Sequence, residues 1–580
     1  MAYPLGIRAN GEHDAGQWLD EYRARIQTRA TPDPHQGSGV ASIPPNFNPW
    51  WDAQVKGQTG LAQQPLTIGI DQMIEGALRH SSFIQIISTE PKIRQTGIVE
   101  EEAAFDWRAF LETKYTDLNE PIGNTLTTGN NADRFIDRNW SMDTGYKRRN
   151  LLGGEAEFSQ RFGHQSNNSR FLLPNPQGTT RLELQYSQPL LNGAGRAYNE
   201  SRILLAQIGA NLADDDFADE LQSHLLRVTQ AYWELYRARA EYFQRQKLLA
   251  AASSTLYILG GRQEVDAVPR QVLRAKSAVA TRQSEIVRAR TSIRNAESQL
   301  RLLVNDPLLL FSGDTEFTPG DSPMTIPLRV SLGNSLHTAL LNRPDISQAI
   351  RDVRASAVRL GVAKNQVLPK LDLLVSSYVA GLEGTGGISK AFGSQFADGR
   401  PTFTVGLLFE LPAGNRAARA RQERRQWEMT RAVGQFRLTV EEALTSVEVA
   451  SREVETTYGE MASRYQAMLA AENEANYLLH RWNVIPGMND SATLLLENLL
   501  DAQERVADEE EALVRAQVSY AMSVVALKRE SGTLLRLHEG STPGLEFVPA
   551  GNPQTQMPAE TIQPPDFQRL PYSSASRSPR

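Results

Sequence analysis

Proline is almost absent from two long stretches of this sequence, and that absence constrains the fold more than any other feature. Pro269 is the only proline in 190–306, and Pro486 is the only one in 413–542. Because proline removes a backbone donor and clashes with the preceding turn of a helix, each stretch predicts two helices joined by a tip that contains the proline. We expect these helices over 197–260, 270–303, 416–482 and 493–531.

Apolar residues recur at every seventh position in all four expected helices. The longest run is Val433, Val440, Val447, Val454, Met461 and Met468. A seven-residue repeat held over this length keeps one seam against a partner and predicts left-handed coiled-coil packing. At a rise of about 1.5 Å per residue, the two longer helices would be roughly 95 and 100 Å long.

The helix after each tip is much shorter than the helix before it, so part of each long apolar seam needs another cover. The segments 82–104 and 344–367 precede the long helices. Each segment, added to the return helix of the same half, has nearly the length of the long helix. We therefore expect a short helix and a return helix, stacked end to end, to cover each long helix.

Alternating apolar and polar residues predict strands between the short and the long helices. They occur in 105–112, 181–187, 371–376 and 402–410. Such runs are typical of strands with lipid on one face and a polar lumen on the other, although a soluble amphipathic sheet has the same pattern. Residues 140–149 and 155–163 indicate an extra hairpin, which we expect to project beyond the sheet rather than to add strands to it.

The two halves of the chain are similar at an offset of about 263 residues, as an internal repeat would be. We expect a first structural repeat over 66–330 and a second over 331–535. The flanking segments 1–65 and 536–580 are rich in Pro, Gly, Ser, Asn and Gln, so we expect poorly ordered extensions there.

Several separate motifs agree in order with those of one family. They are QPLLNGAGRA before the first long helix, NRPDISQAIRDVRASAVRLGVAKNQVLPKLDL in the second half, and LLDAQERV and YAMSVVALKRESGTLL near the end. On these motifs the chain resembles the TolC family of outer-membrane efflux proteins over about 70–535.

The resemblance implies a fold that is mainly α with a β-barrel portion. Three identical protomers would each give four strands to a 12-stranded transmembrane β-barrel, continued by an α-barrel of long helical hairpins in the periplasm. The function implied is a passive exit duct of a tripartite efflux or type I secretion system. A periplasmic adaptor (membrane fusion) protein would couple it to an inner-membrane pump of RND or ABC type.

The resemblance also implies site residues. Asp501 falls where the family carries a constriction aspartate, and Asn498 stands where a neighbouring aspartate is usual. Three copies of Asp501 around a narrow axis would favour cations, whereas the alternative is an ordinary acid on a solvated helix face. The helix tips would contact the adaptor, and for the glycines simple helix termination is the alternative. The tip residues are Gly260, Gly261, Arg262, Asp266, Trp482, Pro486 and Gly487.

Other classes of function find little support. A formal net charge of −6 provides no basic field for nucleic acid, and no apolar run approaches the length of a membrane helix. The chain has no cysteine and eight scattered histidines, so we expect no metal site or cofactor. No nucleophile, base and orienting group stand at recognisable spacing, so we expect no enzyme.

Two questions stay open at this stage. A soluble coiled-coil scaffold or adaptor without a barrel would show the same heptads. Residues 1–40 contain no signal segment, although an outer-membrane protein must be exported. We expect that the recorded start lies downstream of the true one, or that the chain was trimmed.

Overall fold

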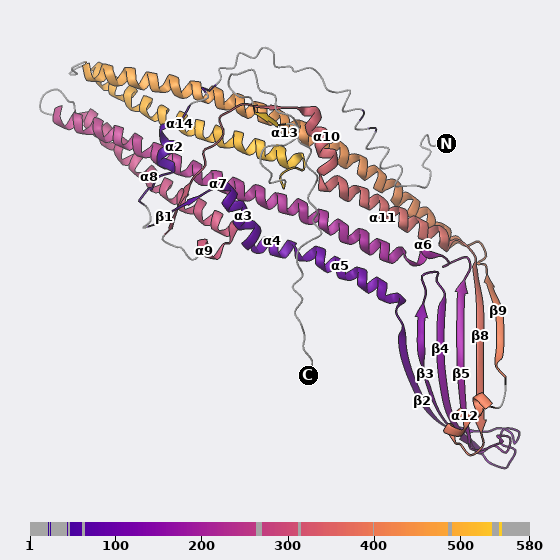
Figure 1. Ribbon diagram of the computed structural model, residues 1–580. Helices are drawn as coiled ribbons and strands as arrows, with labels where there is room; N and C mark the ends of the chain where they lie inside the picture. Colours follow the sequence, from indigo (N-terminus) through magenta and orange to yellow (C-terminus); the bar gives the residue numbers. More distant parts are fainter. Residues whose placement is uncertain are drawn as a thin grey trace.

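The computed structural model is an elongated molecule, with long helices over most of its length and a sheet at one end (Figure 1). It describes residues 21, 24, 43–44, 47–60, 64–262, 269–310, 315–397, 400–484, 490–535 and 545–547.

Four long helices form two antiparallel hairpins, as the proline spacing predicts, although Pro269 is the first residue of α8 rather than part of the tip. Their bounds lie within four residues of the predicted ones: α7 Ser201–Arg262, α8 Pro269–Val304, α13 Arg416–Val484 and α14 Asp490–Glu530. A short helix, α6 (Arg196–Asn199), precedes α7. None of the described helices combines the length and the apolarity needed to cross a bilayer.

The predicted heptad positions form the seams between these helices. Val440 and Val447 on α13 are 0 % exposed, and so are Leu513 and Tyr520 on α14. In the first hairpin the seam residues of α7 and α8 are likewise buried, including Val228, Leu235, Ile286 and Ile293. The predicted apolar seams between the long helices are therefore confirmed.

The shorter helices lie along the long ones. α4 (Ser82–Ile87) and α5 (Thr89–Glu102) pack on α7, while α11 (Pro344–Gln366) packs on both α13 and α7. The break between α4 and α5 falls at Ser88, so Pro91 lies in the first turn of α5, where its missing N–H would have no helical acceptor. The two segments before the long helices thus cover the ends of the seams nearest the sheet.

Several small elements surround the middle of the rods. They are α2 Trp50–Val55, β1 Gln64–Ile68, α3 Ile70–His80, α9 Pro307–Leu310, β6 Thr315–Pro319, β7 Leu328–Val330, α10 Leu332–Asn342 and β10 Leu545–Phe547. β1 pairs with β6 in parallel and β7 with β10 antiparallel. Trp51 on α2 is 1 % exposed, so this part of the expected N-terminal extension is ordered against α7.

A buried ion pair holds this surrounding layer to α7. Arg239 is 0 % exposed, its Nη1 lies 2.6 Å from Glu316 Oε1, and its Nε donates to the Val55 carbonyl oxygen at 2.9 Å. Burial alone would raise the pKa of Glu316, but hydrogen bonds from Thr59 and Arg239 outweigh it and hold the pKa below its ordinary value of 4.5. The pair's stabilisation is therefore present above that value and is lost as the pH falls through the lower pKa of the folded state.

Replacing Arg239 with Met should lower the free energy of unfolding by about 3 to 5 kcal/mol, because Glu316 would be left buried without its cation. The measurement is loss of helical circular dichroism against denaturant in detergent. Arg79→Met removes an exposed i,i+4 pair with Glu75 and should cost less than about 1 kcal/mol. Equal effects of the two substitutions would contradict the role given to the buried pair.

The sheet has six antiparallel strands in the order β2-β3-β4-β5-β8-β9. Their bounds are β2 Arg108–Pro121, β3 Arg134–Arg149, β4 Glu155–Asn167, β5 Gln177–Pro189, β8 Lys370–Glu383 and β9 Thr402–Glu410. The expectation that the hairpin of 140–163 projects beyond the sheet is wrong: β3 and β4 are paired between β2 and β5 over nearly their whole length. β2 and β9 are the two edges, and neither has a further strand beside it among the described residues.

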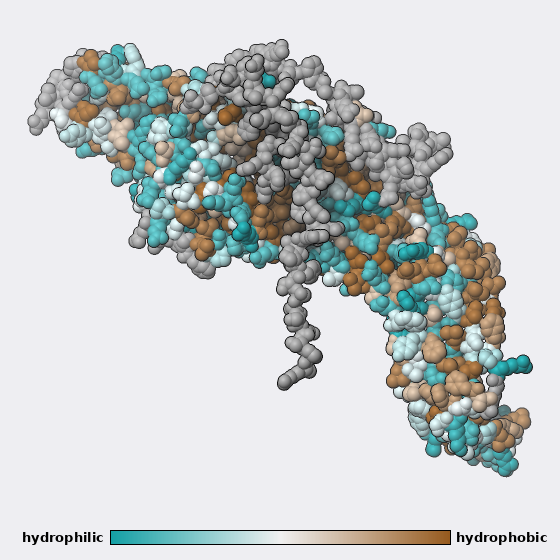
Figure 2. All heavy atoms as spheres, viewed as in Figure 1, coloured by the Kyte–Doolittle hydropathy of each residue, from teal (hydrophilic) through white to brown (hydrophobic). Residues whose placement is uncertain are grey.

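Cross-strand pairing gives the sheet two faces of opposite character. The apolar face carries Leu111, Tyr115, Met142, Tyr146, Phe158, Phe162, Leu182, Leu184, Leu373, Val375, Phe403 and Leu407. The polar face carries Glu112, Lys114, Asp143, Lys147, Glu157, Arg161, Arg181, Glu183, Asp372 and Glu410. Phe403 and Leu407 are each 68 % exposed, and apolar residues gather over β8 and β9 (Figure 2).

A helix lies in the connection between β8 and β9. α12 (Ile388–Ala397) lies on the apolar face near the strand ends farthest from the rods. Thr180 Oγ1 donates to the Ala391 carbonyl oxygen at 2.9 Å, and the amides of Gln160 and Gln395 bond each other. α12 therefore satisfies the polar groups of this part of the apolar face.

Gly381→Ala should loosen α12, because a Cβ at this position would overlap the Ala391 carbonyl oxygen. We expect faster amide hydrogen exchange in 388–397 with little change in the neighbouring strands. Gly406→Ala is the matched control, since a Cβ there meets nothing within 4 Å. Unchanged amide hydrogen exchange in Gly381→Ala would show that α12 does not pack closely against this glycine.

Candidate channel constriction and helix tips

Asn498 and Asp501 lie on one exposed face of α14, near its tip end. They are three residues apart and therefore neighbours on the helix surface. The opposite face carries Leu495, Leu496 and Leu499, which are buried between the two hairpins. The packing of α14 thus fixes the orientation of both predicted constriction residues away from the core.

A buried guanidinium lies beneath this part of α14, and the sequence analysis missed it. Arg282 is 4 % exposed, and its Nη2 donates to the Leu500 carbonyl oxygen at 2.9 Å. Burial lowers the pKa of Arg282, while the charges of Glu504, Glu285 and Asp501 oppose that shift. The acids on α14 therefore stand above a cation that faces the core.

A second arginine ties three helices together a little farther from the tip. Arg245 on α7 reaches Glu511 on α14 at 2.9 Å and also lies 3.5 Å from both Glu285 on α8 and Asp508 on α14. Burial raises the pKa of Asp508, although Arg245 acts in the opposite direction. This network holds α14 at a fixed position between the hairpins.

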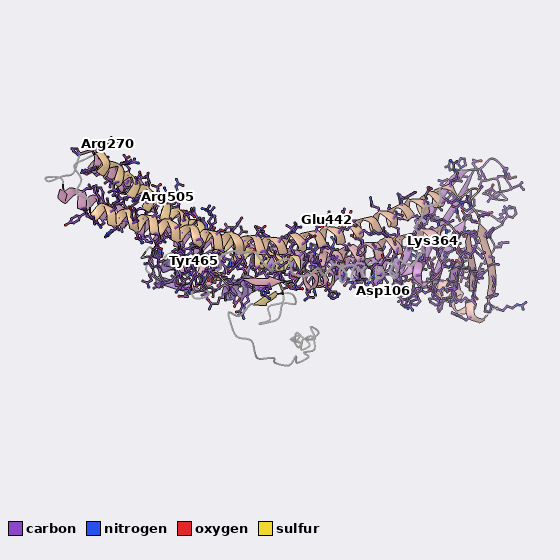
Figure 3. All side chains as sticks on the ribbon, turned by 90° about the horizontal axis from the view of Figure 1, so that it is seen from above. Asp106, Arg270, Lys364, Glu442, Tyr465 and Arg505 are labelled. Atoms are coloured by element: carbon purple, nitrogen blue, oxygen red, sulfur yellow. The ribbon has the colours of Figure 1, made fainter. Side chains whose placement is uncertain are left out.

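The tips of both hairpins share one small apolar core. It joins Leu259 of α7, Val272 of α8, Trp482 of α13 and Leu496 of α14. Arg270, labelled at this end of the molecule in Figure 3, lies 3.8 Å from Glu497 and adds an ion pair at its surface. The structure therefore brings the two tips together, although their sequences are far apart.

The remaining predicted tip residues divide into two groups. Gly260 and Gly261 are exposed in the last turn of α7, whereas Trp482 is only 4 % exposed and packs in the tip core. The side chain of Arg262, and the residues Asp266, Pro486 and Gly487, lie outside the described part of the chain. Contact of the tips with an adaptor stays a prediction.

The described residues contain no group of three or more His, Cys, Asp or Glu that could hold a metal ion. His224 is buried beside Ser81 Oγ and the Leu303 carbonyl oxygen, each 3.1 Å from its Nε2. Its position is explained by packing between α7 and the elements beside it.

Neither a protein-family model nor a curated protein sequence matches this chain. Solved structures do match it over most of its length. The outer-membrane channel OprN covers 87 % of this chain and 98 % of its own at 15 % identity, with a TM-score of 0.56. VceC from Vibrio cholerae covers 80 % and 96 % at 18 % identity, with a TM-score of 0.56. CmeC from Campylobacter jejuni covers 85 % and 95 % at 13 % identity, with a TM-score of 0.57.

The chain has the fold of the TolC-type outer-membrane channels. The resemblance found in the sequence motifs is thus confirmed for the fold. Within the TolC-type fold, the expectation of four strands in each protomer is wrong for this chain, because its sheet has six.

Asp501→Ala should raise the single-channel conductance, or weaken block by divalent cations, if three copies of this residue surround a narrow passage. Alanine would remove both the bulk and the charge of the ring, which widens the narrow passage and weakens its attraction for divalent cations. The measurement uses purified protein in planar lipid bilayers. Glu75→Ala, which removes an exposed acid of α3, is the control and should change neither quantity. The same conductance and block in Asp501→Ala as in the unaltered protein would remove Asp501 from the constriction.

Proposed function

We propose that this protein is a passive exit duct in the outer membrane, formed by three copies of the chain. One observation carries the proposal: the rods end in a sheet with an exposed apolar face, a charged face and two open edges. In a closed ring the apolar face would contact lipid and the charged face would line a water-filled lumen. The fold shared with outer-membrane channels supports the same assignment.

The strand directions allow the ring to close. Because six strands alternate in direction, β2 at one edge runs opposite to β9 at the other. β9 of one copy can therefore pair with β2 of the next in the antiparallel manner of the rest of the sheet. Three copies of the six-stranded sheet would give eighteen strands, and the larger strand number would make a wider barrel than twelve strands.

The charges of the rods favour the same arrangement. Near the tips the helices lie side by side in the order α8, α7, α14 and α13, so α8 and α13 are the outer two. α8 exposes mainly cations, including Arg274, Lys276, Arg288 and Arg294, and the tip half of α13 exposes mainly acids, including Glu453, Glu460 and Glu472. A ring would bring α8 of one copy beside α13 of the next, with opposite charges facing each other.

A soluble coiled-coil scaffold is the second candidate, and the sheet disfavours it. The exposed side chains of β9 include Phe403, Leu407 and Phe409, at 68 %, 68 % and 61 %. A contiguous apolar surface of this kind is costly in water unless lipid or another chain covers it. Lipid on the outside of a closed barrel would cover the part of this face that α12 leaves open.

The partners follow from the position of the tips. With the sheet in the outer membrane, rods of roughly 100 Å would reach across the periplasm and present the tips to a periplasmic adaptor. A pump of RND or ABC type in the inner membrane would supply the energy, because the duct itself has no catalytic role. The constriction formed by Asp501 and Asn498 would stand at the entrance.

Cysteine cross-linking tests the ring directly, since the chain has no cysteine of its own. Lys114→Cys on β2 and Thr404→Cys on β9 place thiols on the polar face of the two edges. A short bis-maleimide linker applied to outer-membrane fractions should convert the double variant into dimers and trimers. The readout is the band pattern on a denaturing gel.

The control pair is Ser141→Cys on β3 with Ser376→Cys on β8, which lie inside the sheet and should give no cross-linked oligomer. A ladder that continues beyond trimers would reject the three-fold ring. Recovery of the edge variant as uncross-linked monomer in the soluble fraction would reject the duct.

A further inference from the structure

A groove rich in arginine lies where the rods meet the sheet, at the end of the molecule opposite the tips. It has a volume of approximately 400 Å³ and is bounded by the ends of α5, α7, α11 and α13 that are nearest the strands. Lys364, labelled in Figure 3, marks this end of α11. The groove is lined by six arginines: Arg149, Arg202, Arg359, Arg421, Arg424 and Arg425. Glu101 is the one carboxylate among its lining residues.

Within the described residues, half of these arginines have no anionic or hydrogen-bonding acceptor. Arg425 and Arg424 share Glu428, at 2.5 and 3.7 Å. Arg149 donates to the neutral Asn199 Oδ1 at 2.7 Å. The side chains of Arg202, Arg359 and Arg421 form no hydrogen bond or ion pair with another described residue.

The groove therefore has an excess of positive charge. The hydrogen bond from Arg425 and the charges of Arg424 and Arg431 hold the pKa of Glu428 below its ordinary value. Like charges at this spacing repel one another, and the repulsion is relieved only by counter-ions from solution or by a bound anion. Guanidinium groups bind phosphate and carboxylate oxygens in two-point contacts, which makes such a cluster selective for those groups.

The sheet shows on which side the groove opens. Arg149 alternates with Arg148 at the end of β3, and it lies on the same face as Lys147, which belongs to the polar face. Its hydrogen bond to Asn199 joins that face to the groove. If the polar face lines the lumen, as the proposed function requires, the groove opens into the lumen.

We propose that this groove binds small multiply charged anions, of the phosphate or carboxylate class, as they pass through the lumen. The inference rests on the proposed duct for the direction in which the groove opens. Three copies would place a basic ring at the entry to the barrel. That ring is distant from the acidic residues of the tip, so the two charged regions would act on different parts of the passage.

Calorimetric titration with sodium tripolyphosphate tests the site on the full chain in detergent. The triple variant R202Q/R359Q/R421Q should bind at least about tenfold more weakly, which corresponds to about 1.4 kcal/mol. R79Q/R329Q/R515Q removes three exposed arginines outside the groove and should bind as the unaltered protein does. R202K/R359K/R421K keeps the charge and should retain part of the affinity, which separates loss of the site from loss of the fold.

Two results would overturn the site: no binding by the unaltered protein, or equal binding by the triple glutamine variant. The bound phosphate could instead belong to a lipid headgroup. Vesicles of phosphatidylglycerol that displace tripolyphosphate, while phosphatidylcholine vesicles do not, would assign the groove to lipid and reject a lumenal site.

Current recordings in planar bilayers separate failure of the anion site from failure of the proposed duct. Tripolyphosphate should block the current of the unaltered protein, and the triple glutamine variant should need at least about tenfold more for the same block. Channels with equal block in both proteins would refute the groove while leaving the duct intact. Binding without any channel would refute the duct and, with it, the lumenal placement of the groove.

Discussion

The burial of continuous apolar seams between long helices is the constraint on which the rest of the structure depends. Side chains such as Val440, Val447 and Tyr520 are fully buried along these seams, and each contributes about 1.5 to 3 kcal/mol relative to exposure. No single hairpin can cover its own long helix, because α8 and α14 are much shorter than α7 and α13. The short helices α5 and α11 cover the remainder, and they are also the elements that lead into the sheet.

The passage from strand to helix depends on polar contacts at one turn. Gly195 has a φ of +94°, a conformation that favours glycine. Asn199 donates to the carbonyl oxygens of Gly193 and Gly195 at 2.9 Å, and Asn365 at the end of α11 accepts from the Gly193 N–H at 2.7 Å. These bonds join the turn that follows β5 to α6 and to the end of α11. The same junction places the arginine groove beside the polar face.

The sequence was informative where the signal is local. Proline spacing and heptads predicted the bounds of the four long helices to within four residues. Alternation of apolar and polar residues located β5, β8 and β9. Alternation also detected the strands of 140–163, but it cannot show which strand lies beside which, so their insertion between β2 and β5 was missed. α12 escaped notice because its glycine and serine are typical of loops, and its stability comes from contacts with Thr180 and Gln160. The burial of Trp482 and the arginine groove depend on residues far apart in the chain, which no local pattern connects.

Electron microscopy of the detergent-purified full chain tests the central claim most directly. The account predicts particles with three-fold symmetry and a continuous lumen, in which each copy contributes six strands to one closed barrel and the tips gather around the axis. Particles in which the rods form a solid bundle, or in which single chains cover the apolar face of their own sheet, would contradict it.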